Sequence, residues 1–177
     1  MGIIFASGLM ESYFVLFPEK EKIIMWNPES ELLEGAKNLG IKIRQLDVAK
    51  STSIRELIEK KFAMTKVSGR LFERLIVSTG IVNEQAWQWL RDYPESSPVL
   101  AFFEKRKSKN IFEFESIKEL IDAYYEGGLY TIYLTNHRCD FLLSYTVEQS
   151  IVAAGTAKRW LEIRMKQEGV GHCFDDL

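Results

Sequence analysis

Apolar positions along the chain recur with period two in some segments and with helical spacing in others. Two β-branched and aromatic runs, 12–17 and 22–26, flank a polar turn and predict an N-terminal β-hairpin. Asn27, followed by a proline, is typical of a helix start, and leucines recur at helical spacing until Gly40 ends the helix. A short strand is expected directly afterwards, over residues 41–46.

Residues 51–93 carry the spacing of three consecutive helices. The first is expected to begin at the capping box of Ser53 and Glu56, in which the hydroxyl and the carboxylate satisfy backbone N–H groups. The second is expected to stop near Gly80, and the third to start at Asn83. This region is therefore expected to contribute most of a helical layer.

The alternation typical of strands returns after Pro94. Strands at 99–104 and 111–114 flank a charged tip, and a second capping box, Ser116 with Glu119, opens a helix. A further hairpin follows, with strands at 130–134 and 141–145. For the last stretch, the pattern favours a short strand near 150–154 and a helix from Thr156 over one long helix that begins at Thr146 and runs through Glu168.

These elements predict a single α+β domain over residues 1–177, with a mainly antiparallel sheet built from hairpins and a helical layer supplied largely by residues 51–93. The length and the 46% apolar content suit a chain that buries one core. With 27% charged residues and a net charge of −2, the composition favours neither intrinsic disorder nor a generally basic nucleic-acid-binding domain.

No apolar run predicts a route into or across a membrane. The first nine residues lack the basic start of a signal peptide, and Glu11 interrupts the apolar stretch. No run approaches the roughly 18 apolar residues that a membrane-spanning helix needs. The two cysteines are too few for a disulfide framework, so we expect a cytoplasmic protein with free thiols.

Both histidines and both cysteines lie in two short clusters. His137 and Cys139 share one predicted turn, and His172 and Cys173 are adjacent near the end of the chain. Structural zinc sites separate the two ligands of a pair by two or more residues, so that both can face the ion. Here one residue and none separate them, and we therefore predict no metal site and no cofactor.

Motifs of nucleotide-dependent, nucleophilic or metal-dependent catalysis are also absent. The sequence contains no phosphate-binding glycine loop, no GxSxG and no HExxH. Cys139 can be paired on paper with His137 or Asp140, but a catalytic cysteine and its base usually come from distant segments. We expect no catalytic residue.

Three surface features are candidates for contact with a partner. Two tryptophans two positions apart on a helix point to different faces, so one of them is expected to be part-exposed. A basic tip lies beside strand aromatics, as in single-strand nucleic-acid binders, but alternation directs Phe112 and Phe114 to the core. A polar turn is the third feature. The candidate partner-binding residues are Trp87, Trp89, Lys105, Arg106, Lys107, His137 and Arg138.

Acidic residues concentrate in the first fifth of the chain. They form a solvated face or an electrostatic target for a basic partner. The residues are Glu11, Glu19, Glu21, Glu29, Glu31 and Glu34.

Five stretches in the second half of the chain form a recognisable combination. They are PVLAFFE at 98–104, FESIKEL at 114–120, YTIYLTN at 130–136, FLLSY at 141–145 and GTAKRW at 155–160. Over Ser97 to Leu161 the chain thereby resembles small bacterial α+β proteins that are immunity partners of secreted polymorphic toxins. The resemblance implies a cognate toxin as partner and no catalytic residues, and it transfers no site residue.

The leading hypothesis is a non-catalytic cytosolic protein-binding module, in particular an immunity protein that neutralises its toxin by surface complementarity. A small enzyme or ligand-binding domain with a carboxylate- and tyrosine-lined cleft is the second hypothesis. A phage- or plasmid-derived nucleic-acid-associated protein is the third, although the balanced charge disfavours nucleic acid as partner. The sequence predicts no oligomeric state.

Overall fold

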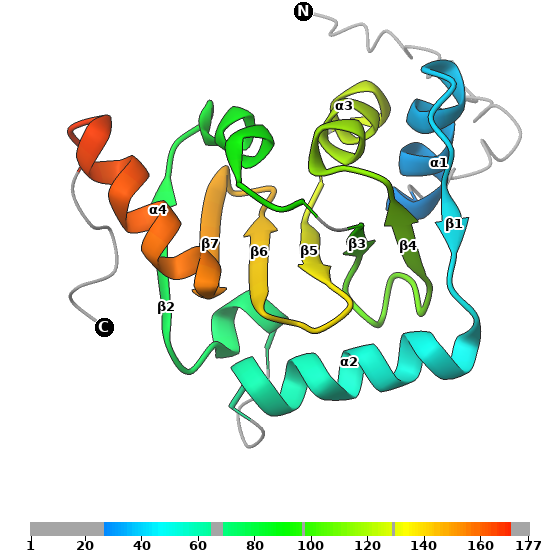
Figure 1. Cartoon of the computed structure of the whole chain (residues 1–177), viewed down its shortest axis with the longest axis horizontal. Coiled ribbons are helices and arrows are strands. Elements are labelled where there is room, and N and C mark those ends of the chain that lie inside the picture. Colours follow the sequence, from blue (N-terminus) through cyan, green and yellow to red (C-terminus); the bar gives the residue numbers. More distant parts are fainter. Residues whose placement is uncertain (1–26, 65–68, 97, 129, 171–177) are drawn as a thin grey trace, which may run out of the picture.

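The computed structural model describes residues 27–64, 69–96, 98–128 and 130–170. The helical elements are α1 (Pro28–Asn38), α2 (Val48–Phe62), the 3-10 helices η1 (Leu71–Arg74) and η2 (Ala86–Asp92), α3 (Ile117–Gly127) and α4 (Thr156–Gln167). The strands are β1 (Arg44–Gln45), β2 (Ser78–Val82), β3 (Val99–Phe102), β4 (Ile111–Phe114), β5 (Ile132–Asn136), β6 (Phe141–Tyr145) and β7 (Ser150–Gly155). All seven join one sheet in the order β1-β4-β3-β5-β6-β7-β2 (Figure 1).

Every neighbouring pair of strands in this sheet is antiparallel. The predicted α+β class with an antiparallel sheet is therefore confirmed. None of the helices within the described ranges combines the length and the apolar character needed to cross a membrane. The predicted hairpin over 12–26 and the pair His172 and Cys173 lie outside the described residues.

Several local predictions are confirmed by side-chain caps. Asn27 accepts a hydrogen bond from the backbone N–H of Glu29 at 3.0 Å and caps α1. Ser116 accepts one from the N–H of Glu119 at 3.2 Å and caps α3. The late strand β7 and the helix α4 also lie where the pattern placed them. Short polar caps therefore fix these helix starts as the sequence indicates.

The predicted start of the next helix at Ser53 is wrong. Helix α2 begins at Val48, because the Asp47 carboxylate accepts a hydrogen bond from the N–H of Lys50 at 2.8 Å. Ser53 lies inside the helix, where its hydroxyl donates to the carbonyl oxygen of Ala49 at 3.1 Å. The earlier aspartate is an equally good N-cap, and it lengthens the helix by six residues.

The helix predicted to stop near Gly80 is also wrong. Only the short 3-10 turn η1 forms there, and Gly80 lies in the middle of β2, opposite Val152 of β7. The pairing of β2 with β7 overrides the local helical spacing. The third predicted helix is the 3-10 helix η2, so residues 51–93 contribute helical elements to both faces of the sheet.

The sheet is buried on both faces. Val99 and Ala101 pack in a cluster with residues of α1, α3, η2 and α4, whereas Leu100 and Phe102 pack in a second cluster with residues of α2 and η1. Phe112 and Phe114 share the first cluster, as alternation predicts. Every residue of β3, β5 and β6 is buried. The faces of these three strands are therefore covered, and accessible polar side chains lie on the helices, at strand ends and in the loops.

Helices α1 and α3 cross in direct backbone contact. A Cβ atom on Gly35 would lie 2.2 Å from the carbonyl oxygen of Ala123, and one on Gly127 would lie 2.2 Å from that of Glu31. Real Cβ atoms do not approach backbone oxygens so closely. Glycine at both positions is what lets α1 lie against α3, and α1 in turn contacts the loop described below.

We expect Gly127→Ala to lower the free energy of unfolding by roughly 1–3 kcal/mol, because backbone on the facing helix cannot yield to the new methyl group. Urea unfolding followed by circular dichroism measures this change. The exposed Ser30→Ala substitution on the outer side of α1 is the control and should change stability by less than about 0.5 kcal/mol. A Gly127→Ala protein as stable as the wild type would contradict the close crossing.

Candidate functional site

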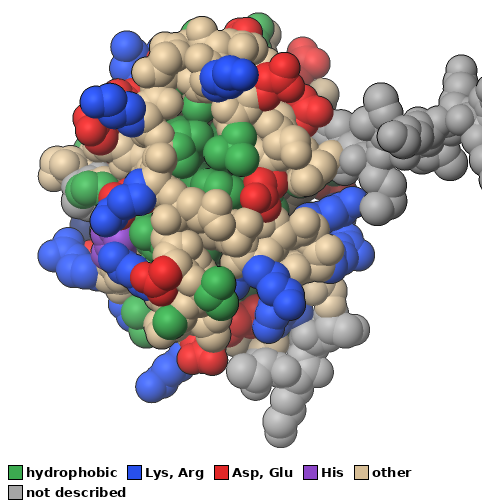
Figure 2. All heavy atoms as spheres, turned by 90° about the vertical axis from the view of Figure 1, so that its right-hand side faces the viewer, with side chains coloured by type: hydrophobic (Ala, Val, Ile, Leu, Met, Phe, Trp, Pro, Cys, Tyr) green, Lys and Arg blue, Asp and Glu red, His purple; other side chains and the backbone are tan. Residues whose placement is uncertain are grey.

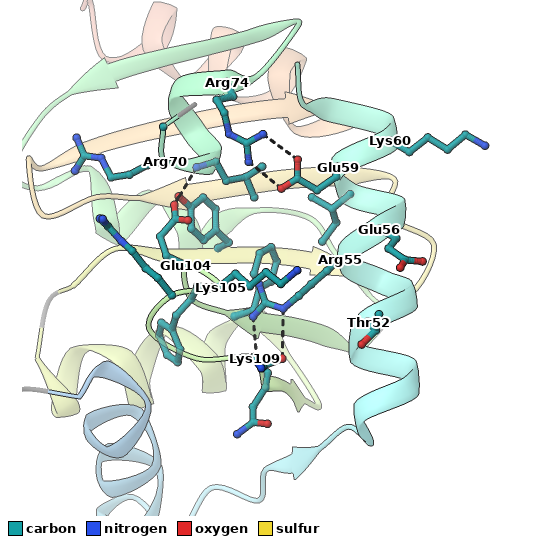
Figure 3. A pocket seen from close by; sticks show the side chains of 18 of the residues that line it. Thr52, Arg55, Glu56, Glu59, Lys60, Arg70, Arg74, Glu104, Lys105 and Lys109 are labelled. Atoms are coloured by element: carbon teal, nitrogen blue, oxygen red, sulfur yellow. Dashed lines mark hydrogen bonds and ion pairs between the residues drawn. The ribbon is translucent and has the colours of Figure 1, made fainter. Parts of the chain in front are cut away.

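A cavity of about 1160 Å³ opens between α2, η1 and the loop that joins β3 to β4 (Figure 3). We call this cavity the α2 cleft, and residues 103–110 the basic loop. Seven Lys and Arg residues and four Glu residues line the cleft, an excess of three positive charges in a chain whose net charge is −2. They are Arg55, Glu56, Glu59, Lys60, Arg70, Glu73, Arg74, Glu104, Lys105, Arg106 and Lys109.

Arg55 of α2 holds the basic loop from one side. Its guanidinium donates hydrogen bonds to four loop carbonyl oxygens, those of Phe103 at 3.1 Å, Ser108 at 3.0 Å, Lys109 at 3.3 Å and Asn110 at 3.2 Å. Figure 3 shows the side chain pointing from the helix toward this loop. Burial lowers the pKa of Arg55, although the nearby Glu104 carboxylate opposes that shift. One half-buried cation thus satisfies four carbonyl oxygens of the loop.

Glu29 holds the same loop from the other side. Its carboxylate accepts hydrogen bonds from the Ser108 hydroxyl at 2.5 Å and from the Asn110 side-chain nitrogen at 2.8 Å. Glu29 lies in the first turn of α1, which packs against the sheet face opposite α2. The interpretation of the N-terminal acidic residues as a solvated face or a partner target is therefore wrong for Glu29, which anchors the loop.

The cations at the tip of the basic loop are left free by this arrangement. Lys105, Arg106, Lys107 and Lys109 are exposed, and within the described residues they have no hydrogen-bond or ion-pair partner through their side chains. Lys60 also lines the cleft, but its side chain points away from it (Figure 3). The cleft therefore carries its unpaired positive charge on one anchored loop.

Glu104 and Tyr133 lie on the inner wall of the cleft. One carboxylate oxygen of Glu104, Oε1, accepts hydrogen bonds from the Leu71 N–H at 2.9 Å and from the Tyr133 hydroxyl. The Tyr133 ring is fully buried and stacks on Phe102 with 5.2 Å between ring centres. Burial, and then the hydrogen bond to Glu104, raise the pKa of Tyr133 well above its ordinary value, so its hydroxyl stays protonated. The second oxygen, Oε2, has no hydrogen-bond partner among the described residues.

The two arginines near η1 are already paired. Arg74 makes two hydrogen bonds to Glu59, at 2.8 and 3.0 Å, and Figure 3 shows these groups facing each other across the top of the cleft. Arg70 pairs with Glu73 at 2.7 Å and with Glu148. These arginines shape the wall of the cleft, and their donors are engaged by the protein itself.

The predicted tryptophan pair lies on a different part of the molecule. Trp89 is buried, with Arg164 5.6 Å from the centre of its ring, whereas Trp87 is half-buried and stacks on Tyr125 at 4.5 Å. The prediction that the two rings face different environments is confirmed. Both belong to η2, which packs on the sheet face opposite the α2 cleft.

The turn after β5 forms a third, separate location. His137 is half-buried and bonds to Glu113, whose carboxylate also accepts a hydrogen bond from Arg44 at 2.8 Å. The exposed Arg138 pairs with Asp140 at 2.7 Å. This turn follows the last residue of β5, whereas Tyr133 of the cleft lies near its first. The structure therefore does not bring the three predicted surface features together.

Cys139 in the same turn is a buried thiol. Burial raises its pKa, which disfavours the reactive thiolate. Within the described ranges, no group of three histidine, cysteine or acidic side chains is placed to hold a metal ion. His172 and Cys173 lie outside those ranges.

The sequence predictions named Lys105, Arg106 and Lys107 of this site but not its inner wall. Strand alternation carries one signal, because Glu104 follows Phe102 by two positions and so faces the same side of the sheet. Arg55 and Glu29 had no comparable signal, since each is one charged helical residue among many. Their partners lie 48 or more residues away in the chain.

Comparisons with known proteins add no further residue to this site. No family model matches the chain, and neither a curated protein nor a solved structure is significantly similar to it. The function is therefore argued from the geometry of the α2 cleft and the basic loop.

Replacing Arg55 by Met should loosen the basic loop, because four carbonyl oxygens lose their charged donor. We expect the free energy of unfolding to fall by about 1–3 kcal/mol, and amide hydrogen exchange to accelerate in residues 103–110. Lys60→Met on the same helix is the matched control, because Lys60 is exposed and points away from the cleft. Unchanged loop exchange in Arg55→Met would show that other contacts hold the loop.

Proposed function

We propose that the protein is a non-catalytic binding module that recognises an acidic surface of a partner protein through the basic loop and the α2 cleft. One observation carries the proposal. Four exposed loop cations lack partners within the described residues, and the loop that presents them is fixed by Arg55 and Glu29. A loop already held in one conformation loses little entropy when it binds, which favours affinity. Unpaired cations also accelerate encounter with a negatively charged partner.

The immunity resemblance supplies the finer form of this proposal. In that form the partner is a toxin of bacterial origin, and binding covers the acidic surface of the toxin. The complex forms in the cytoplasm, where the buried Cys139 thiol stays reduced. This mode of action needs neither a cofactor nor a metal ion.

A ligand-binding or enzymatic function is the second candidate, and the Glu104–Tyr133 pair favours it. A carboxylate and a tyrosine converge on the wall of a cavity, as the second hypothesis from the sequence requires. The Tyr133 hydroxyl, however, is fully buried and already donates to Glu104. Glu104 is the only one of the two that offers a free atom to a bound molecule.

Nucleic acid receives less support as the partner. The aromatic rings that line the cleft, Phe102, Phe103 and Tyr133, are all buried, so they present no face on which a base can stack. On the face shown in Figure 2, basic and acidic side chains are interspersed rather than gathered in a basic stripe.

Charge reversal on the basic loop tests the proposal. The chain is co-expressed with the toxin-like product of each neighbouring reading frame, and protection from growth arrest and the Kd of the purified complex are measured. We expect Lys105→Glu/Arg106→Glu to abolish protection and to raise the Kd by roughly tenfold to hundredfold at low salt, because attraction becomes repulsion.

The control variant is Arg159→Glu/Lys166→Glu on α4, which changes the net charge equally on the other face of the sheet. It should bind and protect like the wild type. Equal loss in both double variants would leave only a non-specific effect of net charge. Undiminished binding by the loop variant would refute the proposed surface.

A further inference from the structure

The α2 cleft also indicates which part of an acidic partner it receives. Building on the function proposed above, we infer that the cleft binds an extended acidic segment of the partner. Acidic side chains of the segment contact the basic loop, and one of its N–H groups donates a hydrogen bond to Glu104 Oε2. The inference rests on the size of the cleft, on the orientation of Glu104, and on the distribution of paired and unpaired charges.

The size of the cavity suits a stretch of polypeptide. Pockets for small molecules usually measure about 300–1,000 Å³. The α2 cleft, at about 1160 Å³, lies just above the upper end of that range, and four separate chain segments line it: α2, η1, the basic loop and Tyr133 of β5. A cavity of this size between a helix and a loop accommodates several consecutive residues of a partner.

Glu104 presents a fixed hydrogen-bond acceptor to the cavity. The Leu71 N–H and the Tyr133 hydroxyl both bind Oε1, so the plane of the carboxylate is set before any ligand arrives. Oε2 is left without a partner among the described residues. An acceptor in this position is satisfied by a donor such as a backbone N–H of a bound segment.

The surrounding charges require that segment to be acidic overall. Arg55 and Arg74 lie close enough to Glu104 to interact with it electrostatically. Among the other lining charges, Glu56 and Lys60 of α2 and the cations of the basic loop have no ion-pair partner within the described residues, so the unpaired charge at the cleft is positive overall. A neutral N–H donor on a chain that carries carboxylates therefore matches both parts of the cleft, whereas a lysine or arginine side chain does not.

Fluorescence anisotropy with the full chain tests the inference. The measurement is made at about 50 mM salt, where the screening length is roughly three times that at about 0.5 M salt and attraction between charges is therefore less screened. The probe is a labelled ten-residue peptide of alternating Glu and Gly, and the matched peptides carry Gln or Lys in place of Glu. We expect only the Glu peptide to bind, and the Lys105→Glu/Arg106→Glu variant to lose that binding.

Glu104→Gln separates a hydrogen-bonding role from simple electrostatics. The glutamine still accepts from Leu71 and Tyr133, but an NH₂ group replaces the free acceptor. We expect peptide affinity to fall about tenfold, because a hydrogen bond to a charged group is lost. If Glu104 acted only through its charge, this variant would bind the acidic peptide more tightly. Glu56→Gln, an exposed position lining the same cleft, is the matched control and should show no loss.

Three outcomes would overturn the inference: tighter binding by Glu104→Gln, equal binding of the Glu peptide and a ten-nucleotide oligothymidylate, or no peptide binding at all. If the peptide fails while loop charge reversal still abolishes binding of a whole partner protein, the segment inference fails and the proposed function stands. If loop charge reversal leaves partner binding unchanged, the proposed function itself fails.

Discussion

The half-buried guanidinium of Arg55 connects α2 to the loop on which the site depends. It extends from α2 over the ring of Phe102 and donates to four carbonyl oxygens of the loop that follows β3. A loop of eight residues without such donors would expose its carbonyls to water and sample many conformations. With Glu29 of α1 bound to the same loop, helices from both faces of the sheet determine where its cations point.

The location of the site follows from a sheet that is covered on both faces. Alternate residues of β3 pack against opposite helical layers, and none of the residues of the buried strands β3, β5 and β6 is charged. Glu104 is the first residue after β3 that faces α2 and is not fully buried. The polar wall of the cleft therefore starts at the end of β3. Tyr133 faces the same side of the sheet as its register partner Phe102, and its hydroxyl donates a hydrogen bond to Glu104. Cys139, in the turn after β5, is buried in the same way, and this burial disfavours its thiolate form by raising the pKa of the thiol.

Most elements of the fold could be predicted from local chemistry, whereas the site required long-range contacts. The helix starts at Asn27 and Ser116 could be predicted, because a capping side chain bonds to a backbone N–H group only two or three residues away. The prediction that a helix ends near Gly80 was wrong, because Gly80 lies in β2. Its conformation is fixed by pairing with β7, some 70 residues later, rather than by its neighbours in sequence. The basic tip was visible in the sequence as a run of cations. That Arg55 and Glu29 immobilise it was not visible, since nothing local distinguishes these residues from other charged helical positions.

The anchored basic loop and the α2 cleft together form the proposed binding surface. Hydrogen exchange of the full chain with and without a cognate partner protein measures this most directly, because it maps the contact along the backbone. The account predicts slower exchange in residues 103–110 and in the part of α2 around Arg55 when the partner is bound. Slower exchange confined to η2 and α3, around Trp87 and Tyr125, would contradict it and place the binding surface on the opposite face of the sheet.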